Sequence, residues 1–371
     1  MRQSSPLTLL KVVPLFLLLL SGCQPWAYVA VTNVNPYSVT EYPVFATGNW
    51  APAVTLAGNN TGIDLPLGIA SDNVGSLRIG NGLGGFNGIG GSVTSYVNFA
   101  EGNSAPIATI AGQNTGLTAG AGQVALDNAG NIYVIKPAFS NQGIAVYDRG
   151  ATGDVAPIAT ISGSNTQISQ PNGIAVDGSG KIYVANFGGP NSSITVYSPG
   201  SNGNVAPIAV ISGPNTGVVG PQALAVTPDG TVYVCNELSA VTIFAPGANG
   251  NIFPQRTISG NNTGLYNPNG IAVDSDGDIF ISVTGQAKPD AILVFAPGAN
   301  GNVAPKAIIT GDQTGLNYPF AMTIIPPPSL VLNPSVFFRR VFNPTAPVPH
   351  AEDFRLLRHR RSKRIATFSK S

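Results

Sequence analysis

Short runs of alternating apolar and polar residues, separated by glycine-rich turns, recur along most of this chain. Residues 173–177 (Gly-Ile-Ala-Val-Asp) form one run, residues 178–180 the turn, and residues 181–186 (Lys-Ile-Tyr-Val-Ala-Asn) the next run. Alternation with a period of two predicts half-buried β-strands, and glycine supplies the positive φ that tight hairpins need. No amphipathic helix of useful length is predicted between the runs.

The hairpin belongs to a repeat of about 50 residues. Each repeat opens with an Ala-Pro pair, replaced once by Phe-Pro, and its prolines are Pro52, Pro106, Pro157, Pro207, Pro254 and Pro305. An alternating run ending at glycine follows, then a turn of the Asn-Thr-Gly type, the hairpin, and a fourth strand. Four antiparallel strands per radial repeat describe one blade of a β-propeller, which buries its faces only by stacking on neighbouring blades.

The number of blades follows from the complete and partial repeats. Complete four-strand sets occupy residues 67–112, 122–163, 172–213, 222–260 and 269–311. Residues 27–58 hold three further strands, and residues 320–325 hold one. The sequence therefore predicts an all-β, six-bladed propeller of four-stranded antiparallel blades over residues 23–328, closed by the N-terminal strands pairing with a C-terminal strand. Closure avoids the exposed blade faces of an open ring.

The hairpin also carries a family resemblance. Residues 171–177 (Pro-Asn-Gly-Ile-Ala-Val-Asp), followed by Ile-Tyr-Val-Ala-Asn at 182–186, resemble the NHL repeat, and the likeness covers residues 27–325. This resemblance implies the propeller fold and leaves function open. Propellers of this kind include lyases and hydrolases that use histidine or a metal ion on the axial face. The chain's two histidines, His350 and His359, lie beyond the repeats, so no such residue carries over.

The N-terminus is typical of an export signal. Residues 1–22 combine Arg2 and Lys11 with an apolar run too short to span a bilayer comfortably. The sequence Leu-Ser-Gly-Cys that ends at Cys23 resembles a bacterial lipobox, which implies cleavage before Cys23 and lipid on its thiol. Gln24 follows where an inner-membrane retention signal has Asp, which favours the outer membrane or cell surface. The alternative is an ordinary signal peptide with a chance cysteine.

Residues 329–371 form a basic tail, predicted to be largely disordered from about Asn343. The tail holds nine of the 18 Lys and Arg residues, beginning with Arg339. Phe354 and Leu357, together with two later apolar residues, could line one side of a basic helix on anionic lipid. The alternative is a solvated tail without a partner.

Charge and candidate metal ligands narrow the chemistry. A net charge of +1 supplies no field that would attract nucleic acid, and we expect no nucleic-acid partner. Asp274, Asp276 and Asp278 imitate the start of a calcium loop, but the twelfth position holds Gly285 in place of glutamate. We expect turn-forming hydrogen bonds here, with a calcium site as the alternative. The remaining cysteine, Cys235, is predicted to be a buried thiol without a catalytic role.

The connections between the second and third strands differ in every repeat, whereas those between the third and fourth are nearly uniform. In a propeller these variable loops share one face with the connections between blades. A ligand site is therefore expected there, on loops held by a rigid scaffold. The residues proposed for it are Phe139, Phe187, Asn191 and Lys288; the alternative is drift in unconstrained loops.

These features favour a lipid-anchored, non-catalytic binding or scaffold module of the cell envelope. An uncharged surface rich in Asn, Gly, Ser and Thr suits a glycan or another protein as the partner. No catalytic residue and no firm cofactor emerge from the sequence. Two alternatives are a metal-dependent propeller lyase or hydrolase that uses carboxylates, and a purely structural surface protein.

Overall fold

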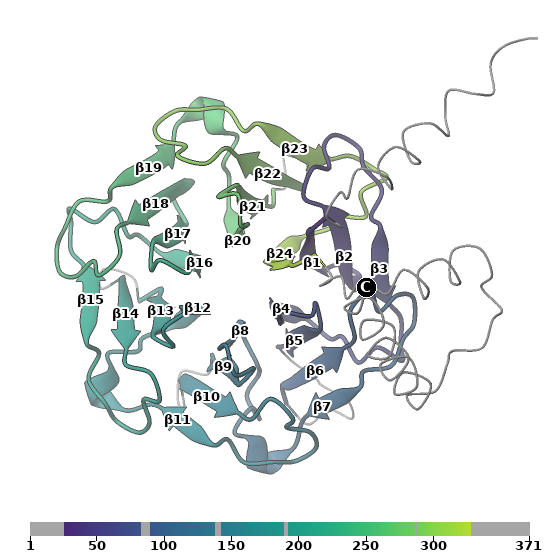
Figure 1. Cartoon of the computed structure of the whole chain (residues 1–371), viewed down its shortest axis with the longest axis vertical. Helices are drawn as coiled ribbons and strands as arrows, with labels where there is room; N and C mark the ends of the chain where they lie inside the picture. The colour runs from purple at the N-terminus through teal and green to yellow at the C-terminus, as the bar shows by residue number, and fades with distance from the viewer. Residues whose placement is uncertain (1–25, 83–89, 138–141, 189–191, 286–287, 328–371) are drawn as a thin grey trace, which may run out of the picture. The chain divides into compact units, whose positions relative to one another are not determined.

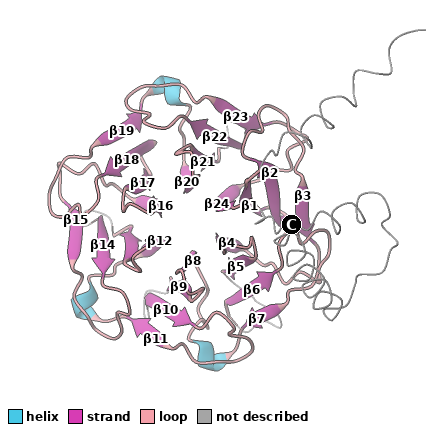
Figure 2. Cartoon of the chain, viewed as in Figure 1, coloured by secondary structure: helices cyan, strands magenta, loops and turns pink. Residues whose placement is uncertain are grey.

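The computed structural model describes residues 26–82, 90–137, 142–188, 192–285 and 288–327. Six four-stranded antiparallel sheets are arranged radially around an axis, as Figure 1 shows. The described helices are single 3-10 turns at the periphery, so the fold is all-β (Figure 2). The predicted six-bladed β-propeller is confirmed. None of the described helices is long and apolar enough to cross a bilayer.

Strands are lettered A to D from the axis outward in each blade. Blade one, the composite blade, consists of β24 (Pro319–Ile325), β1 (Tyr28–Val34), β2 (Tyr37–Pro43) and β3 (Val54–Ala57). Blade two consists of β4 (Pro66–Ser71), β5 (Leu77–Asn81), β6 (Ser92–Tyr96) and β7 (Ala108–Ile110). Blade three consists of β8 (Val124–Leu126), β9 (Ile132–Lys136), β10 (Gly143–Tyr147) and β11 (Ala159–Ile161).

The other three blades follow the same order. Blade four consists of β12 (Pro171–Val176), β13 (Ile182–Asn186), β14 (Ser193–Tyr197) and β15 (Ala209–Ser212). Blade five consists of β16 (Pro221–Val226), β17 (Val232–Asn236), β18 (Ala240–Phe244) and β19 (Arg256–Ser259). Blade six consists of β20 (Pro268–Val273), β21 (Ile279–Val283), β22 (Ala291–Phe295) and β23 (Ala307–Thr310). The 3-10 turns are η1 (Gln113–Thr115), η2 (Ser164–Thr166) and η4 (Asn261–Thr263).

The composite blade closes the ring by joining the two ends of the repeat region. Strand β1 pairs with β2 on one side and with the C-terminal β24 on the other. Tyr28 lies opposite Ile325, and Val31 lies opposite Met322, before a bulge shifts the register. This pairing confirms the predicted closure of N-terminal strands by a C-terminal strand.

The hydrophobic core lies between blades. Six clusters of buried residues fill the six interfaces between neighbouring blades. Cys235 of β17, for example, packs in one cluster with Ile281 and Leu293 of the next blade. Two of the clusters flank the composite blade, so its strands are buried from both sides. The alternating pattern of the sequence is thus satisfied only in the assembled ring.

A hydrogen bond from a buried tyrosine holds the peripheral turns in four blades. The Tyr197 hydroxyl, at the end of strand C, donates to the carbonyl oxygen of Thr166 at 2.5 Å. Tyr42, Tyr96 and Tyr147 make the corresponding bonds to the carbonyl oxygens of Thr314, Thr61 and Thr115. Phe244 and Phe295 end strand C in blades five and six and are fully buried without a hydroxyl. Threonine recurs in the Asn-Thr-Gly type turn because its hydroxyl bonds within the turn: the Thr166 Oγ1 donates to the carbonyl oxygen of Gly163 at 2.7 Å and accepts from the N–H of Ile168 at 3.3 Å.

Candidate functional site

The B–C loops and the D–A connections lie at the same end of the blades, which we call the B–C end. Asn186, the last residue of β13, accepts a hydrogen bond from the backbone N–H of Ser169 in the preceding D–A connection at 3.1 Å. Gln142, just before β10, donates to the carbonyl oxygen of Ile168 and accepts from the N–H of Gln170. The variable loops therefore contact the connections between blades, as the sequence led us to expect.

Two of the four proposed ligand-face residues lie within the described part of the chain. The Phe187 ring is half-buried, and its Cε2 atom would lie 3.1 Å from a Cβ atom added at Gly220 of the next D–A connection. Lys288 is exposed, and its Nζ lies 4.7 Å from the centroid of the Tyr266 ring. They belong to the B–C loops of blades four and six, which blade five separates. Phe139 and Asn191 lie outside the described residues.

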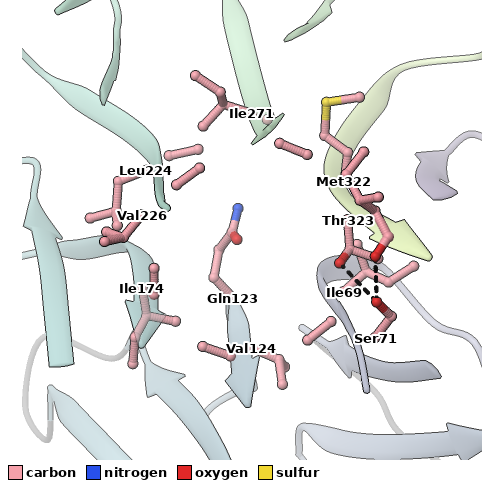
Figure 3. Close-up of a pocket in the computed structure, with 18 of the residues that line it drawn as sticks. Ile69, Ser71, Gln123, Val124, Ile174, Leu224, Val226, Ile271, Met322 and Thr323 are labelled. Atoms are coloured by element: carbon pink, nitrogen blue, oxygen red, sulfur yellow. Dashed lines mark hydrogen bonds between the residues drawn. The ribbon is translucent and has the colours of Figure 1, made fainter. Parts of the chain in front are cut away.

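The six A strands enclose an axial cavity of about 310 Å³. Its lining is mostly aliphatic and includes Ile69, Ile174, Leu224 and Met322 (Figure 3). Its polar side chains are Ser71, Gln123 and Thr323. The Ser71 hydroxyl donates to the carbonyl oxygen of Ile324 at 2.6 Å. More of the accessible lining surface is polar than apolar, which differs from the predominantly apolar lining of most small-ligand sites, and the volume is at the low end for such a site.

Gln123 is the distinctive residue of this cavity, and it was not among the residues proposed from the sequence. Figure 3 shows its side chain pointing between the A strands toward the middle of the cavity. Its buried Nε2 has no hydrogen-bond partner among the described residues. The other five blades place glycine or alanine at the equivalent position: Gly68, Gly173, Ala223, Gly270 and Ala321. Aligning the repeats on the end of strand A would have revealed the exception, because only Gln123 breaks the small-residue rule.

The acidic residues at the ends of the A strands form turns, as predicted. The Oδ1 atom of Asp274 accepts hydrogen bonds from the backbone N–H groups of Asp276, at 3.0 Å, and Asp278, at 2.9 Å. Asp72, Asp127 and Asp177 each accept the same pair of turn hydrogen bonds. These turns lie at the opposite end of the blades, the A–B end.

Two of the three proposed calcium ligands, Asp274 and Asp278, have other partners in this structure. Burial raises the pKa of Asp274, and Asp278 forms an ion pair with Lys306. Within the described ranges, no three or more His, Cys, Asp or Glu side chains gather closely enough to hold a metal ion. The arrangement fits turn formation better than a calcium cage, which needs six to eight oxygen ligands.

Cys235 is fully buried and unpaired with another cysteine, as expected. Burial raises the pKa of its thiol, which keeps it protonated, and its Sγ faces the carbonyl oxygen of Gly270 at 3.9 Å. Because the thiolate is the reactive form, this cysteine is a packing residue.

Comparisons with known proteins support the fold. No model of a known protein family and no curated protein matches the sequence. A chain of a nidogen–laminin complex is 12% identical with a TM-score of 0.56, and the match covers 81% of this chain and 98% of that one. A Bacteroides caccae protein of unknown function is 10% identical with a TM-score of 0.56, covering 81% and 99%. A candidate 6-phosphogluconolactonase of Bacteroides fragilis is 14% identical with a TM-score of 0.51, covering 81% and 98%.

At these identities the likeness concerns the fold alone. The protein belongs to the structural class of six-bladed β-propellers, and solved propellers from bacteria share its architecture.

Proposed function

We propose that the protein is a lipid-anchored binding module of the bacterial cell envelope, built on an NHL-like propeller. The anchor is the lipid expected on Cys23, which would hold the ring at the outer membrane or the cell surface. The ligand face is the B–C end, and its partner is a neutral glycan or another envelope protein. Calcium is not required by this proposal.

One contrast within the repeat carries the binding role. The C–D connections use the same contact in all six blades: an Asn or Asp side chain accepts a backbone N–H of the preceding blade's D–A connection. These acceptors are Asn49, Asn103, Asp154, Asn204, Asn251 and Asn302. Such uniformity is what a structural contact requires.

At the B–C end, four blades share one contact, in which an Asn at the end of strand B accepts a backbone N–H of the D–A connection: Asn33, Asn81, Asn186 and Asn236. The loops that follow strand B show no such uniformity. The loop of blade four places Phe187 beside Gly220. The loop of blade five is a tight turn in which Leu238 is 70% exposed. The loop of blade six places Lys288 over the ring of Tyr266. Side chains that differ between blades on one end of a rigid ring suit recognition of an asymmetric partner. A purely structural surface protein would not need this variation.

The anchor is tested by labelling cells with a radioactive fatty acid. The natural chain is expected to incorporate the label and sediment with membranes. Cys23→Ala is expected to lose both properties. A variant that remains membrane-bound without the label would show that the lipobox interpretation is wrong, or that the basic tail suffices for attachment.

The binding face is tested by retention of envelope glycans and proteins on the immobilised chain. The test variant changes Phe139, Phe187, Asn191 and Lys288 to Ala. The control is Val74→Ala, an exposed apolar residue in the A–B turn of blade two. A partner retained by the natural chain and the control, and lost by the test variant, supports recognition at the B–C end. Equal retention by all three would contradict it.

A further inference from the structure

A cluster of five aromatic side chains, four of them exposed, lies at the A–B end of the composite blade. The rings of Trp26 and Phe45 meet edge to face with their centroids 4.5 Å apart, and those of Phe45 and Trp50 lie 5.9 Å apart. Beside them, the ring of Tyr28 meets that of Phe99 of blade two at 5.4 Å. We call these five residues the aromatic patch. Trp26 and Phe45 are each 45% exposed, and Trp50 is 40% exposed.

The repeat itself does not account for this patch. Aligned on the Ala-Pro or Phe-Pro pair that ends the connection, Phe45 and Phe99 stand where blades four to six have glycine: Gly200, Gly247 and Gly298. Phe99 even keeps the left-handed backbone of those glycines, with φ of 57°. Such a conformation is unfavourable for a bulky residue. An exposed phenylalanine in a strained position indicates a use for its side chain outside the ring.

Both ends of the ring emerge beside the patch. Tyr28 lies opposite Ile325, so β1 begins where β24 ends. Cys23 precedes Trp26 by three residues, and three residues of extended chain span at most about 11 Å. The tail that follows Pro327 carries nine Lys and Arg against two acidic residues, Glu352 and Asp353. The proposed lipid site therefore lies close to the patch along the chain, and the described C-terminal strand ends opposite the start of β1.

From this arrangement we infer that the aromatic patch lies in the headgroup region of the membrane that holds the lipid on Cys23. The inference rests on the proposed lipid anchor. Trp and Tyr favour this interface because one end of the ring is apolar and the other polar. The short tether forces the A–B end toward the lipid surface, and the basic tail adds attraction to anionic headgroups.

This orientation gives the anchor a second function, which is to direct the ligand face. Strand β1 runs seven residues from the patch to the B–C end, which is about 20 Å at the usual rise per residue. With the patch in the headgroups, the composite blade's B–C loop faces away from the membrane. A partner can then reach Phe187 and Lys288 without displacing the protein from the bilayer.

The experiment uses the only two tryptophans of the chain, Trp26 and Trp50, as reporters of the patch. Acylated protein is reconstituted into vesicles of phosphatidylethanolamine and phosphatidylglycerol, with and without bromine atoms near the carbonyl end of the acyl chains. Flotation of the protein with the vesicles measures attachment through the lipid anchor, separately from the tryptophan signal. The expected result is quenching of tryptophan emission by the brominated lipid, a shift to shorter wavelength relative to protein in detergent, and protection from aqueous iodide.

Two variants locate the effect. Phe45→Ser with Phe99→Ser removes the phenylalanines and keeps both reporters, so quenching by brominated lipid is expected to fall to the level seen with unmodified lipid. Leu238→Ser, at the exposed B–C turn of blade five, is the control and is expected to behave as the natural chain. Circular dichroism of each variant verifies that the ring is intact, and quenching of the natural chain tests the inference without any variant.

The outcomes separate the anchor from the patch. Protein that floats while its tryptophans remain open to iodide and unaffected by brominated lipid would retain the anchor and overturn the patch inference. Protein that does not float refutes the proposed anchor; its quenching by added brominated vesicles would then decide the patch by itself. A wavelength shift that grows with protein concentration and ignores lipid would assign the patch to a second copy, which also overturns the inference.

Discussion

Glu41 is a buried carboxyl, and the cost of ionising it should appear in the pH dependence of stability. It lies in the middle of β2, opposite Ala30 on β1 and Val54 on β3, and is only 1% exposed. Its Oε2 has no hydrogen-bond partner among the described residues. Burial raises the pKa of this carboxyl from 4.5 to about 7, because the charged form loses its hydration.

The direction of the effect follows from linkage. The folded state holds the proton up to about pH 7, whereas the unfolded chain releases it near pH 4.5. The free energy of unfolding therefore falls as pH rises through this window and is lowest above it. A shift of this size corresponds to about 3 kcal/mol above pH 7, taking about 1.4 kcal/mol per pKa unit. Glu41→Gln keeps the shape and removes the titration.

Urea unfolding of the natural chain and Glu41→Gln across this pH range measures the effect. Near pH 4.5 the two proteins should differ little, and above pH 7 the variant should be more stable by up to about 3 kcal/mol. Trp26 and Trp50 precede β1 and β3, so their fluorescence emission monitors unfolding of the composite blade. Circular dichroism monitors unfolding of the whole ring. Glu101→Gln, at an exposed glutamate, serves as the control. A difference that does not vary with pH would refute the assignment of a buried, titrating Glu41.

Three further predictions test the packing. Gly220→Ala should destabilise the ring by more than about 1 kcal/mol, because its φ is +52° and the new Cβ would lie 3.0 Å from the Glu237 Cβ and 3.1 Å from the Phe187 Cε2; Gly203→Ala, also left-handed but uncrowded, should cost less in the same thermal melts. Tyr197→Phe should lose about 1 kcal/mol in urea unfolding, and no loss would contradict the role of its hydroxyl. In the acylated protein Cys235 should resist thiol reagents until urea unfolds the ring; rapid labelling of the native protein would contradict its burial.

The repeat made the fold predictable from sequence. Alternating apolar residues, glycine turns and an Ala-Pro or Phe-Pro pair every 50 residues or so define the blade, because each unit meets nearly the same neighbours. The unpaired strands at 27–58 and 320–325 predicted closure, since only their combination completes a blade. The turn-forming role of Asp274 was likewise predictable, because a carboxylate at the start of a tight turn that contains glycine, here Gly277, bonds the local backbone.

The positions that depart from the repeat could not be interpreted without the ring. Gln123 occupies a place that is small in the other blades, but only the convergence of six A strands shows that its carboxamide enters the axial cavity. Trp26 is separated in sequence from Phe45 and Trp50 by β1 and β2, and the pairing of those strands brings its ring against that of Phe45. Local periodicity thus determined the blade. Closure of the ring determined which exceptional side chains meet, because those contacts join residues whose separation along the chain carries no local signal.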